Sequence, residues 1–512
     1  MKNILAKAVM ATLMLSGALM AGAQQINPVT EAVLNSYNEA LSEDPKDYVT
    51  LFDRASLYVD MGEYNRALSD IDMAIEYTPA KESDYRMAEY SLKADILSSM
   101  KEYDKAVAAL EAALKINPSS QPELYKAGNL YLLANKPKEA LEIFKRLQRE
   151  NSRSQEAFYG MAKANVMLGN NDEASKLIEE IENLGKQSFI TYTRIGDLYA
   201  DMEKYVEATK NYVIAYTMTE ENSRPLQSLK HISAKAPETV LSTLEGIIES
   251  QPDNVQLNYV KAILSYDAGR YDRAEKACQD LAKGLEEESP AVYRMMAMSQ
   301  LAQAKQTEAL QSIDKAESLA PGSVGVILDK ADILLSSDPA KALEYADKAL
   351  KIAPDDESAL ILKAKAAILA GKSNEALDAL NNVIMMDPSN SQALLLKGHL
   401  NAELLKDEKA AATEYAKAGD MKGDGVTSLV YAALGKAKAG KKLDADGYIN
   451  EAINKAGNDK DYLYLIAVYY AQTGNTAKAK EFLQKAIANG YNNQYNLKLN
   501  REPLLNLQPI RN

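Results

Sequence analysis

Two short segments of the chain come close to motifs that bind ligands. Residues 435–442 read Gly-Lys-Ala-Lys-Ala-Gly-Lys-Lys, one residue away from the phosphate-binding loop G-x-x-x-x-G-K-[ST]. Lys442 stands where that loop has the hydroxyl residue that holds magnesium, and the segment ends a predicted helix instead of following a strand. Asp420–Gly425 begins like a calcium loop, but Lys422 and Tyr431 replace two of the oxygen ligands. We therefore predict no bound cofactor and no bound metal.

Residues for acid-base or nucleophilic chemistry are scarce. The 512 residues include one Cys and two His. His231 and His399 lie far apart in the chain, and neither belongs to a metal-ligand spacing such as H-E-x-x-H. Cys278 falls at an apolar position of a predicted helix, so we expect a buried small side chain rather than a nucleophile. Most enzyme classes are disfavoured by this composition.

The first residues predict the compartment. Lys2 and Lys7 precede an apolar stretch, Ala8 to Met20, which is followed by the small residues Ala21-Gly22-Ala23. This order is typical of a secretory signal peptide, here residues 1–23. The stretch is shorter than the roughly 20 apolar residues that span a membrane. We expect an exported protein of the Gram-negative periplasm or cell-envelope surface, with no transmembrane segment in the mature chain.

The charge of the chain argues against polyanionic partners. The net charge is -13, and cleavage of the signal peptide would remove two lysines and make the mature chain more acidic. An acidic protein repels nucleic acid and anionic lipid over most of its surface. We therefore expect no nucleic-acid partner.

A fixed spacing organises the rest of the sequence. Ala106, Ala140, Ala174 and Ala208 lie 34 residues apart in charged, helix-favouring stretches, as in a helix-turn-helix repeat. If this Ala is the twentieth residue of a unit, the eighth residue is also small, and the twenty-fourth is large and apolar on the same helical face. The eighth residues are Ala94, Gly128, Ala162 and Gly196, and the twenty-fourth are Leu110, Phe144, Ile178 and Tyr212. Pro residues near the end of a unit stop its second helix.

This pattern resembles the tetratricopeptide repeat family over nearly the whole predicted mature chain. Tyr58, Tyr131, Tyr199 and Tyr470 match the aromatic residue at the family's eleventh position, whereas its fourth-position Trp is absent from a chain without Trp. The resemblance implies an all-α fold, a right-handed α-solenoid superhelix of about thirteen repeats. They begin near Tyr48, Met87, Gln121, Gln155, Phe189, Glu221, Val255, Pro290, Val324, Glu357, Ser391, Val426 and Lys460.

The repeats predict the organisation of the chain. After the signal peptide, residues 24–47 form an N-terminal capping helix and residues 48–220 hold repeats one to five. Residues 221–254 form a degenerate repeat, because Ser228 and Val240 occupy its two small positions, and we expect a bend or a domain break there. Residues 255–489 hold repeats seven to thirteen. Residues 490–512 supply a C-terminal cap, since the ends of a repeat stack must be covered for solubility.

The resemblance also implies which residues face a concave groove. In the family, the second, fifth, ninth, twelfth and thirteenth residues of each first helix line it. This register predicts a peptide-binding set of Tyr125, Asn129, Tyr159, Lys163, Asp197, Tyr259 and Tyr266, with Phe52 and Tyr464 at equivalent places. Exposed aromatic side chains beside polar ones suit peptide capture. The alternative is that the tyrosine rings pack between neighbouring helices.

Two function classes follow. We expect a non-enzymatic protein-protein interaction scaffold or adaptor in the bacterial cell envelope, which binds a peptide or protein in its concave groove. The alternative is an envelope enzyme or glycan-processing factor that uses carboxylates on the solenoid. The 72 Asp and Glu residues would bring carboxylates together by chance, and no pair stands out from the charged helix faces.

Overall fold

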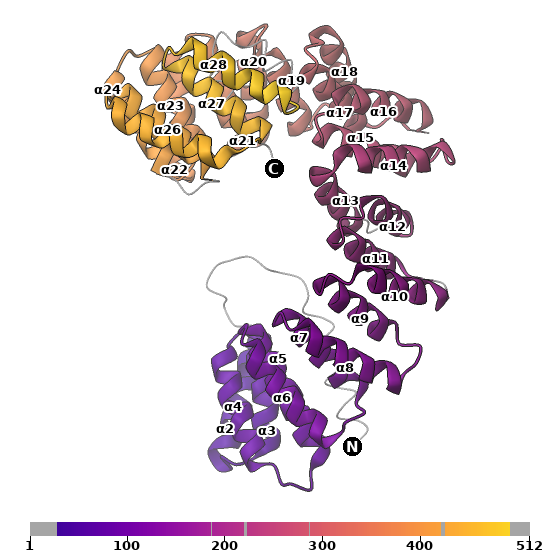
Figure 1. Cartoon of the computed structure of the whole chain (residues 1–512). Coiled ribbons are helices and arrows are strands. Elements are labelled where there is room, and N and C mark those ends of the chain that lie inside the picture. Colours follow the sequence, from indigo (N-terminus) through magenta and orange to yellow (C-terminus); the bar gives the residue numbers. More distant parts are fainter. Residues whose placement is uncertain (1–27, 186, 220–222, 286, 421–424, 492–512) are drawn as a thin grey trace. The chain divides into compact units, whose positions relative to one another are not determined.

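The structure of the protein, a computed structural model, describes residues 28–185, 187–219, 223–285, 287–420 and 425–491 (Figure 1). The regular elements in these ranges are 27 α-helices, α2 to α28. The predicted signal peptide and nearly all of the predicted C-terminal cap lie outside the described residues. From α3 onward the helices form thirteen consecutive pairs joined by short turns, which confirms the all-α fold of stacked repeats.

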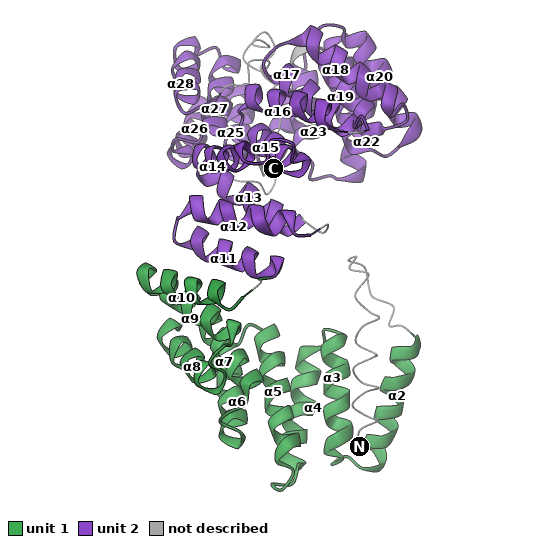
Figure 2. Ribbon diagram, turned by 90° about the vertical axis from the view of Figure 1, so that its right-hand side faces the viewer, with its two compact units in different colours: residues 1–187 green, residues 188–512 purple. Residues whose placement is uncertain are grey.

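The chain divides into two compact units, with the boundary between Gln187 and Ser188 (Figure 2). This boundary lies between the fourth and fifth repeats, ahead of the degenerate repeat. Unit 1 contains α2 Pro28–Glu43, α3 Tyr48–Asp60, α4 Tyr64–Tyr77, α5 Ser83–Ser99, α6 Tyr103–Ile116, α7 Gln121–Leu133, α8 Pro137–Glu150, α9 Gln155–Met167 and α10 Asn171–Asn183.

Unit 2 contains the remaining eighteen helices. They are α11 Phe189–Asp201, α12 Tyr205–Thr217, α13 Ser223–Lys235, α14 Pro237–Glu249, α15 Val255–Asp267, α16 Tyr271–Gly284, α17 Pro290–Ala302, α18 Gln306–Leu319, α19 Val324–Leu334, α20 Pro339–Ile352, α21 Glu357–Leu369, α22 Ser373–Met386, α23 Ser391–Glu403, α24 Glu408–Asp420, α25 Val426–Lys438, α26 Lys442–Ala456, α27 Lys460–Gln472 and α28 Thr476–Ala488.

The first helix of a repeat begins at the predicted residue in all but two repeats. In the sixth repeat, Glu221 lies outside the described residues. In the second, α5 begins at Ser83, about one turn before Met87. The additional turn places the Tyr85 ring edge-on to Tyr48 of the first repeat, with 5.6 Å between ring centroids. The longer spacing between the first two repeats is therefore taken up by helix rather than by loop.

Small residues at the eighth position accommodate the side chain at the twenty-fourth. A Cβ atom added to Gly128 would lie 2.5 Å from the Phe144 ring, and one added to Gly196 would lie 2.5 Å from the Tyr212 ring. Repeats with Ala at the eighth position, such as Ala94 and Ala162, have the aliphatic Leu110 and Ile178 instead. All four large side chains are at most 2% exposed. The two positions are thus complementary in size in these four repeats.

Helix α2 covers the first repeat of unit 1. Leu41 of α2 is buried against a cluster that includes Leu51 and Ile71. Arg54 of α3 donates from Nη1 to the side-chain oxygen of Asn38 at 2.8 Å, and from Nε to Asp70 of α4 at 2.6 Å. One guanidinium group therefore connects α2 to both helices of the first repeat.

Candidate functional site

Helices α7 and α9 of unit 1 are the first helices of the third and fourth repeats, and they lie side by side. They carry the first four predicted groove residues. The fifth, ninth and thirteenth residues of a helix lie on one face, because each step of four residues is about one turn. In α7 these residues are Tyr125, Asn129 and Leu133, and in α9 they are Tyr159, Lys163 and Met167. We call these six residues the α7–α9 face.

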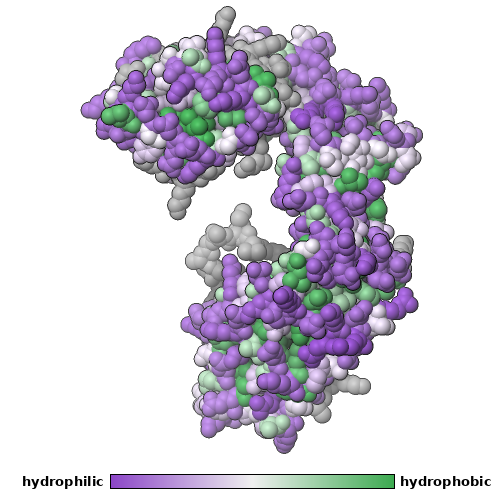
Figure 3. Space-filling model, viewed as in Figure 1, coloured by the Kyte–Doolittle hydropathy of each residue, from purple (hydrophilic) through white to green (hydrophobic). Residues whose placement is uncertain are grey.

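The α7–α9 face combines apolar and polar side chains that water can reach. Leu133 is 57% exposed and Met167 is 37% exposed, and the other four residues are half-buried. Within the described part of the chain, no hydrogen bond engages the side chain of Tyr125 or Asn129. Leu133 and Met167 were not among the predicted site residues, although the same register of four-residue steps reaches them. In Figure 3, apolar surface shows as green patches among purple, hydrophilic side chains.

Asp197 belongs to unit 2, where it supports the fifth repeat. Its carboxylate accepts a hydrogen bond from the hydroxyl of Tyr212 at 2.8 Å, and Arg224 approaches it at 3.5 Å. Burial raises the pKa of Tyr212, and the charge of Asp197 and this hydrogen bond raise it further. One oxygen of Asp197 thus accepts a hydrogen bond from a buried tyrosine of its own repeat. The α7–α9 face therefore consists of residues of unit 1 alone.

The other predicted groove tyrosines make ring contacts within unit 2. Tyr259 of α15 is partly buried against a cluster that includes Cys278 and Met296. Tyr266 contacts Tyr271 edge-on, with ring centroids 5.5 Å apart. Tyr464 is 6% exposed, and its ring stacks on that of Tyr491 with 4.3 Å between the ring centroids. The environments of Tyr259 and Tyr464 are those of packing residues.

The residues considered for chemistry have structural surroundings. Cys278 is fully buried, and burial raises its pKa to about 12, so the thiol is a poor nucleophile at neutral pH. Residues 435–442 form the end of α25 and the turn to α26, so no strand precedes them. No group of three or more His, Cys, Asp or Glu side chains among the described residues is arranged to hold a metal ion. None of the described helices has the length and apolar character needed to cross a membrane.

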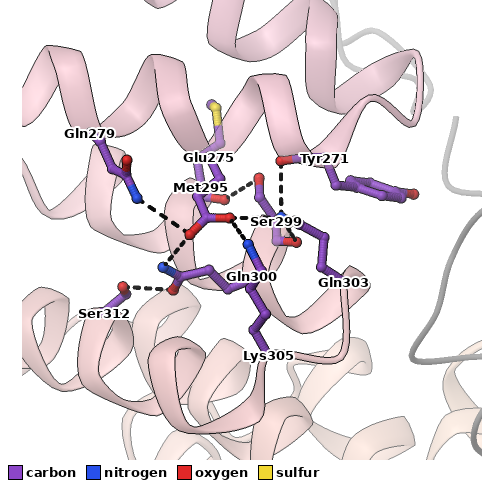
Figure 4. A network of polar contacts seen from close by, with 9 residues as sticks. All are labelled: Tyr271, Glu275, Gln279, Met295, Ser299, Gln300, Gln303, Lys305 and Ser312. Carbon is purple, nitrogen blue, oxygen red and sulfur yellow. Dashed lines mark hydrogen bonds and ion pairs between the residues drawn. The ribbon is translucent and has the colours of Figure 1, made fainter.

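A buried carboxylate in unit 2 is held by a network of polar side chains (Figure 4). Glu275 of α16 accepts hydrogen bonds from Gln300 at 3.1 Å, from Gln303 at 2.9 Å and from Lys305 at 2.6 Å. Burial acts to raise the pKa of Glu275, but the hydrogen bonds from Lys305 and the two amides lower it overall. A carboxylate with this many donors joins the seventh repeat to the eighth and is poorly suited to accept a proton from a substrate.

Comparison with protein families identifies tetratricopeptide repeats along the chain. Family models described as tetratricopeptide repeat match residues 52–121, 334–400 and 461–488. A model described as subunit 3 of the anaphase-promoting complex, or cyclosome, matches residues 99–181.

Similar curated proteins share only part of their length with this chain. A tetratricopeptide repeat and J domain-containing co-chaperone of Cryptococcus neoformans is 34% identical over 76 residues, which are 12% of this chain and 15% of that protein. The Hsp70-Hsp90 organizing protein of Triticum aestivum is 24% identical over 232 residues, 39% of this chain and 40% of that protein. The chain thus spans less than half the length of these relatives.

Solved structures of similar proteins include other helical repeats. Yeast Tom70 shares 15% identity over 91% of this chain and 96% of that chain, with a TM-score of 0.39. A tetratricopeptide repeat protein from Parabacteroides merdae shares 18% identity over 56% of this chain and 98% of that chain, with a TM-score of 0.31. With its thirteen helix pairs, its paired small and large positions and the family matches between residues 52 and 488, this chain belongs to the tetratricopeptide repeat family.

Proposed function

We propose that this protein is a non-enzymatic scaffold that binds a segment of a partner protein on the α7–α9 face. The observation that carries the proposal is the exposure of Leu133 and Met167, 57% and 37%, at equivalent places on adjacent helices. Exposed apolar side chains that are grouped and bordered by polar ones mark protein-binding surfaces. The partial relatives named as co-chaperone and as Hsp70-Hsp90 organizing protein agree with a role in holding other proteins.

The chemistry of the α7–α9 face suits an extended or helical peptide with apolar side chains. Leu133 and Met167 provide apolar contact, and a Met side chain adapts its shape to different partners. The amide of Asn129 can donate to and accept from a peptide backbone. Lys163 adds a positive charge, so an acidic residue in the bound segment would increase affinity.

We propose that the partner is another exported protein, since residues 1–23 have the order of a signal peptide. The prediction is a mature N-terminus at Gln24, because Ala21 and Ala23 are the small residues that processing requires. N-terminal sequencing of the protein from fractionated cells tests it. Recovery of the intact Met1 form from the cytoplasm would contradict export and the envelope setting of the partner.

Substitutions on the α7–α9 face test the binding proposal once crosslinking in the native envelope has identified a partner. We expect Tyr125→Ala or Tyr159→Ala, and the double variant Leu133→Ser with Met167→Ser, to weaken binding by about 2 kcal/mol, or thirtyfold. The double variant alters exposed side chains, so its thermal unfolding should hardly change. Lys176→Ala is the control, because Lys176 lies on α10 and, among the described residues, pairs with Glu173 of the same helix at 3.2 Å.

Each outcome separates binding from packing. Unchanged affinity in both tyrosine variants and in the double variant would exclude this face as the binding site. Lower unfolding temperatures in Tyr125→Ala and Tyr159→Ala, with unchanged affinity, would show that these rings pack between α7 and α9 instead.

A further inference from the structure

Lysines gather on one edge of unit 2, at the turns inside its last three repeats. These turns join α23 to α24, α25 to α26 and α27 to α28. The six helices share one hydrophobic core cluster, and turns inside stacked repeats recur along one edge of the stack. We call their lysines the basic edge, which comprises Lys406, Lys409, Lys436, Lys438, Lys441, Lys442, Lys478 and Lys480.

Ion pairs with the described residues do not neutralise the charge of the basic edge. None of its lysines forms an ion pair with another described residue, and Lys478 donates to the hydroxyl of Tyr470 at 3.3 Å. Several turns of earlier repeats differ, because they carry a cation that pairs with an acid of the preceding repeat. Examples are Lys136 with Asp104 at 2.6 Å, Arg270 with Glu238 at 2.5 Å and Lys305 with Glu275 at 2.6 Å.

An apolar side chain projects into water next to these lysines. Leu443, which directly follows Lys442, is 87% exposed, and Leu405 beside Lys406 is 43% exposed. No other large apolar side chain in the described ranges is as exposed as Leu443. Leu443 is the second residue of α26, and the second residue of α8, α10 and α16 is Lys138, Asp172 and Asp272. Charged residues are thus tolerated at this position, and packing does not account for a leucine that is 87% exposed.

We propose that the basic edge binds an anionic membrane surface, with its lysines against lipid phosphates and Leu443 inserted at the acyl boundary. A cluster of lysines beside an exposed leucine is the combination that holds a protein at a membrane interface. A nucleic acid, or a protein segment with acidic side chains alone, would use the lysines but would leave Leu443 in water. This membrane contact is separate from the protein-binding α7–α9 face.

The acidity of the whole chain does not prevent this contact. At physiological ionic strength charges are screened over about 8 Å, so acids elsewhere in the molecule contribute little at the basic edge. Within the turn segments 405–409, 436–446 and 475–481, the acids are Asp407, Glu408, Asp444, Asp446 and Glu481. Glu481 pairs with Lys485 at 2.7 Å. The lysines outnumber these acids, and the edge attracts anionic lipid.

Vesicle sedimentation with the full chain tests the proposal. We expect binding to vesicles of equal parts phosphatidylglycerol and phosphatidylcholine, little binding to pure phosphatidylcholine, and weaker binding as salt increases. Each lysine at an anionic surface contributes about fivefold in affinity. The double variant Lys441→Gln with Lys442→Gln should therefore bind the anionic vesicles with about 25-fold lower affinity. Leu443→Gln should lose about tenfold.

The control variant is Lys145→Gln with Lys176→Gln. It removes the same charge from exposed lysines of unit 1, at 47% and 70% side-chain exposure, and should bind vesicles like the unaltered protein. All substituted side chains are exposed, so circular dichroism melting should be unchanged. The proposal is overturned if the unaltered protein does not bind vesicles with phosphatidylglycerol at low salt, or if the control loses as much affinity as the Lys441 and Lys442 variant. Unchanged affinity in Leu443→Gln would also overturn it and favour an acidic macromolecule as the ligand.

Discussion

Glu89 of α5 is a buried carboxyl group with one hydrogen-bonded oxygen. It is 0% exposed, its Oε1 lies against the hydroxyl of Thr78, and its Oε2 has no partner among the described residues. The Thr78 hydroxyl also lies 2.8 Å from the carbonyl oxygen of Ala74, and it has one proton to donate. The single Thr78 proton is therefore shared between two acceptors, and Glu89 receives little compensation for the burial of a negative charge.

This environment predicts a pH-dependent stability. Burial raises the pKa of Glu89, and the weaker opposing effects of Thr78 and Arg86 do not reverse it. The stability that the proton contributes is complete below the unfolded pKa of about 4.3, and it is lost as the pH rises through the folded pKa. Glu89→Gln keeps a neutral side chain at every pH. We therefore expect it to match the unaltered protein in acid and to exceed its unfolding free energy by about 1 kcal/mol at neutral pH.

Urea unfolding at several pH values measures this difference, and Glu76→Gln on the exposed surface of α4 is a matched control. A parallel pH dependence in the Glu89→Gln variant and the unaltered protein would mean that Glu89 is ionised in the folded state.

Between the helices of a repeat, the matched sizes of the eighth and twenty-fourth residues determine stability. Gly128→Ala would place a methyl group 2.5 Å from the Phe144 ring, and overpacking of this kind costs about 1 to 3 kcal/mol. Adding Phe144→Leu should recover part of this loss, since Ala94 with Leu110 is a natural combination. Denaturant unfolding of both single variants and the double variant gives the coupling energy. If the two losses simply add, the residues are not complementary.

The turns inside repeats offer a second test at this scale. Ala304, between α17 and α18, has a φ of 58°, in a place where other repeats have glycine, such as Gly169 with a φ of 78°. A left-handed conformation costs a non-glycine residue about 1 to 2 kcal/mol. We expect Ala304→Gly to raise the unfolding free energy by about 1 kcal/mol and Gly169→Ala to lower it by a similar amount. No atom lies within 4 Å of a Cβ added to Gly169, so its effect would be conformational and not steric.

Across the whole molecule, stability should be local, because each repeat contacts only its neighbours. Ala140→Leu tests this property, since Ala140 is fully buried in α8 and a larger side chain would disturb its crossing with α7. Overpacking costs about 1 to 3 kcal/mol. Hydrogen exchange should show lost protection between about residues 121 and 180, with unit 2 unaffected. Unchanged protection in that range, or an equal loss in unit 2, would contradict the repeat register or the local coupling.

The repeat architecture could be predicted from the amino-acid sequence because its signals are short-range and recur. Small residues at the eighth and twentieth positions, prolines at the end of a unit and glycines at the turn each specify local structure, and their spacing places the first helix of most repeats at the right residue. The second repeat was misplaced by about one turn, because the residues before Met87 continue α5 and carry Tyr85 to Tyr48. That contact links two repeats, and its effect on the helix start does not appear in the periodic pattern.

The candidate site and the basic edge depend on contacts between residues far apart in the sequence. Tyr125 and Tyr259 occupy the same fifth position of a first helix. Tyr259 packs against a cluster that includes Met296, whereas Tyr125 shares its helix face with the exposed Leu133. Lysines at equivalent turns likewise differ, since Lys305 meets Glu275 and Lys441 meets no acid in the described chain. A periodic pattern specifies which face of a helix a residue occupies. The size and charge of the side chains on the neighbouring repeat then determine whether that residue is buried, forms an ion pair or stays accessible to a binding partner.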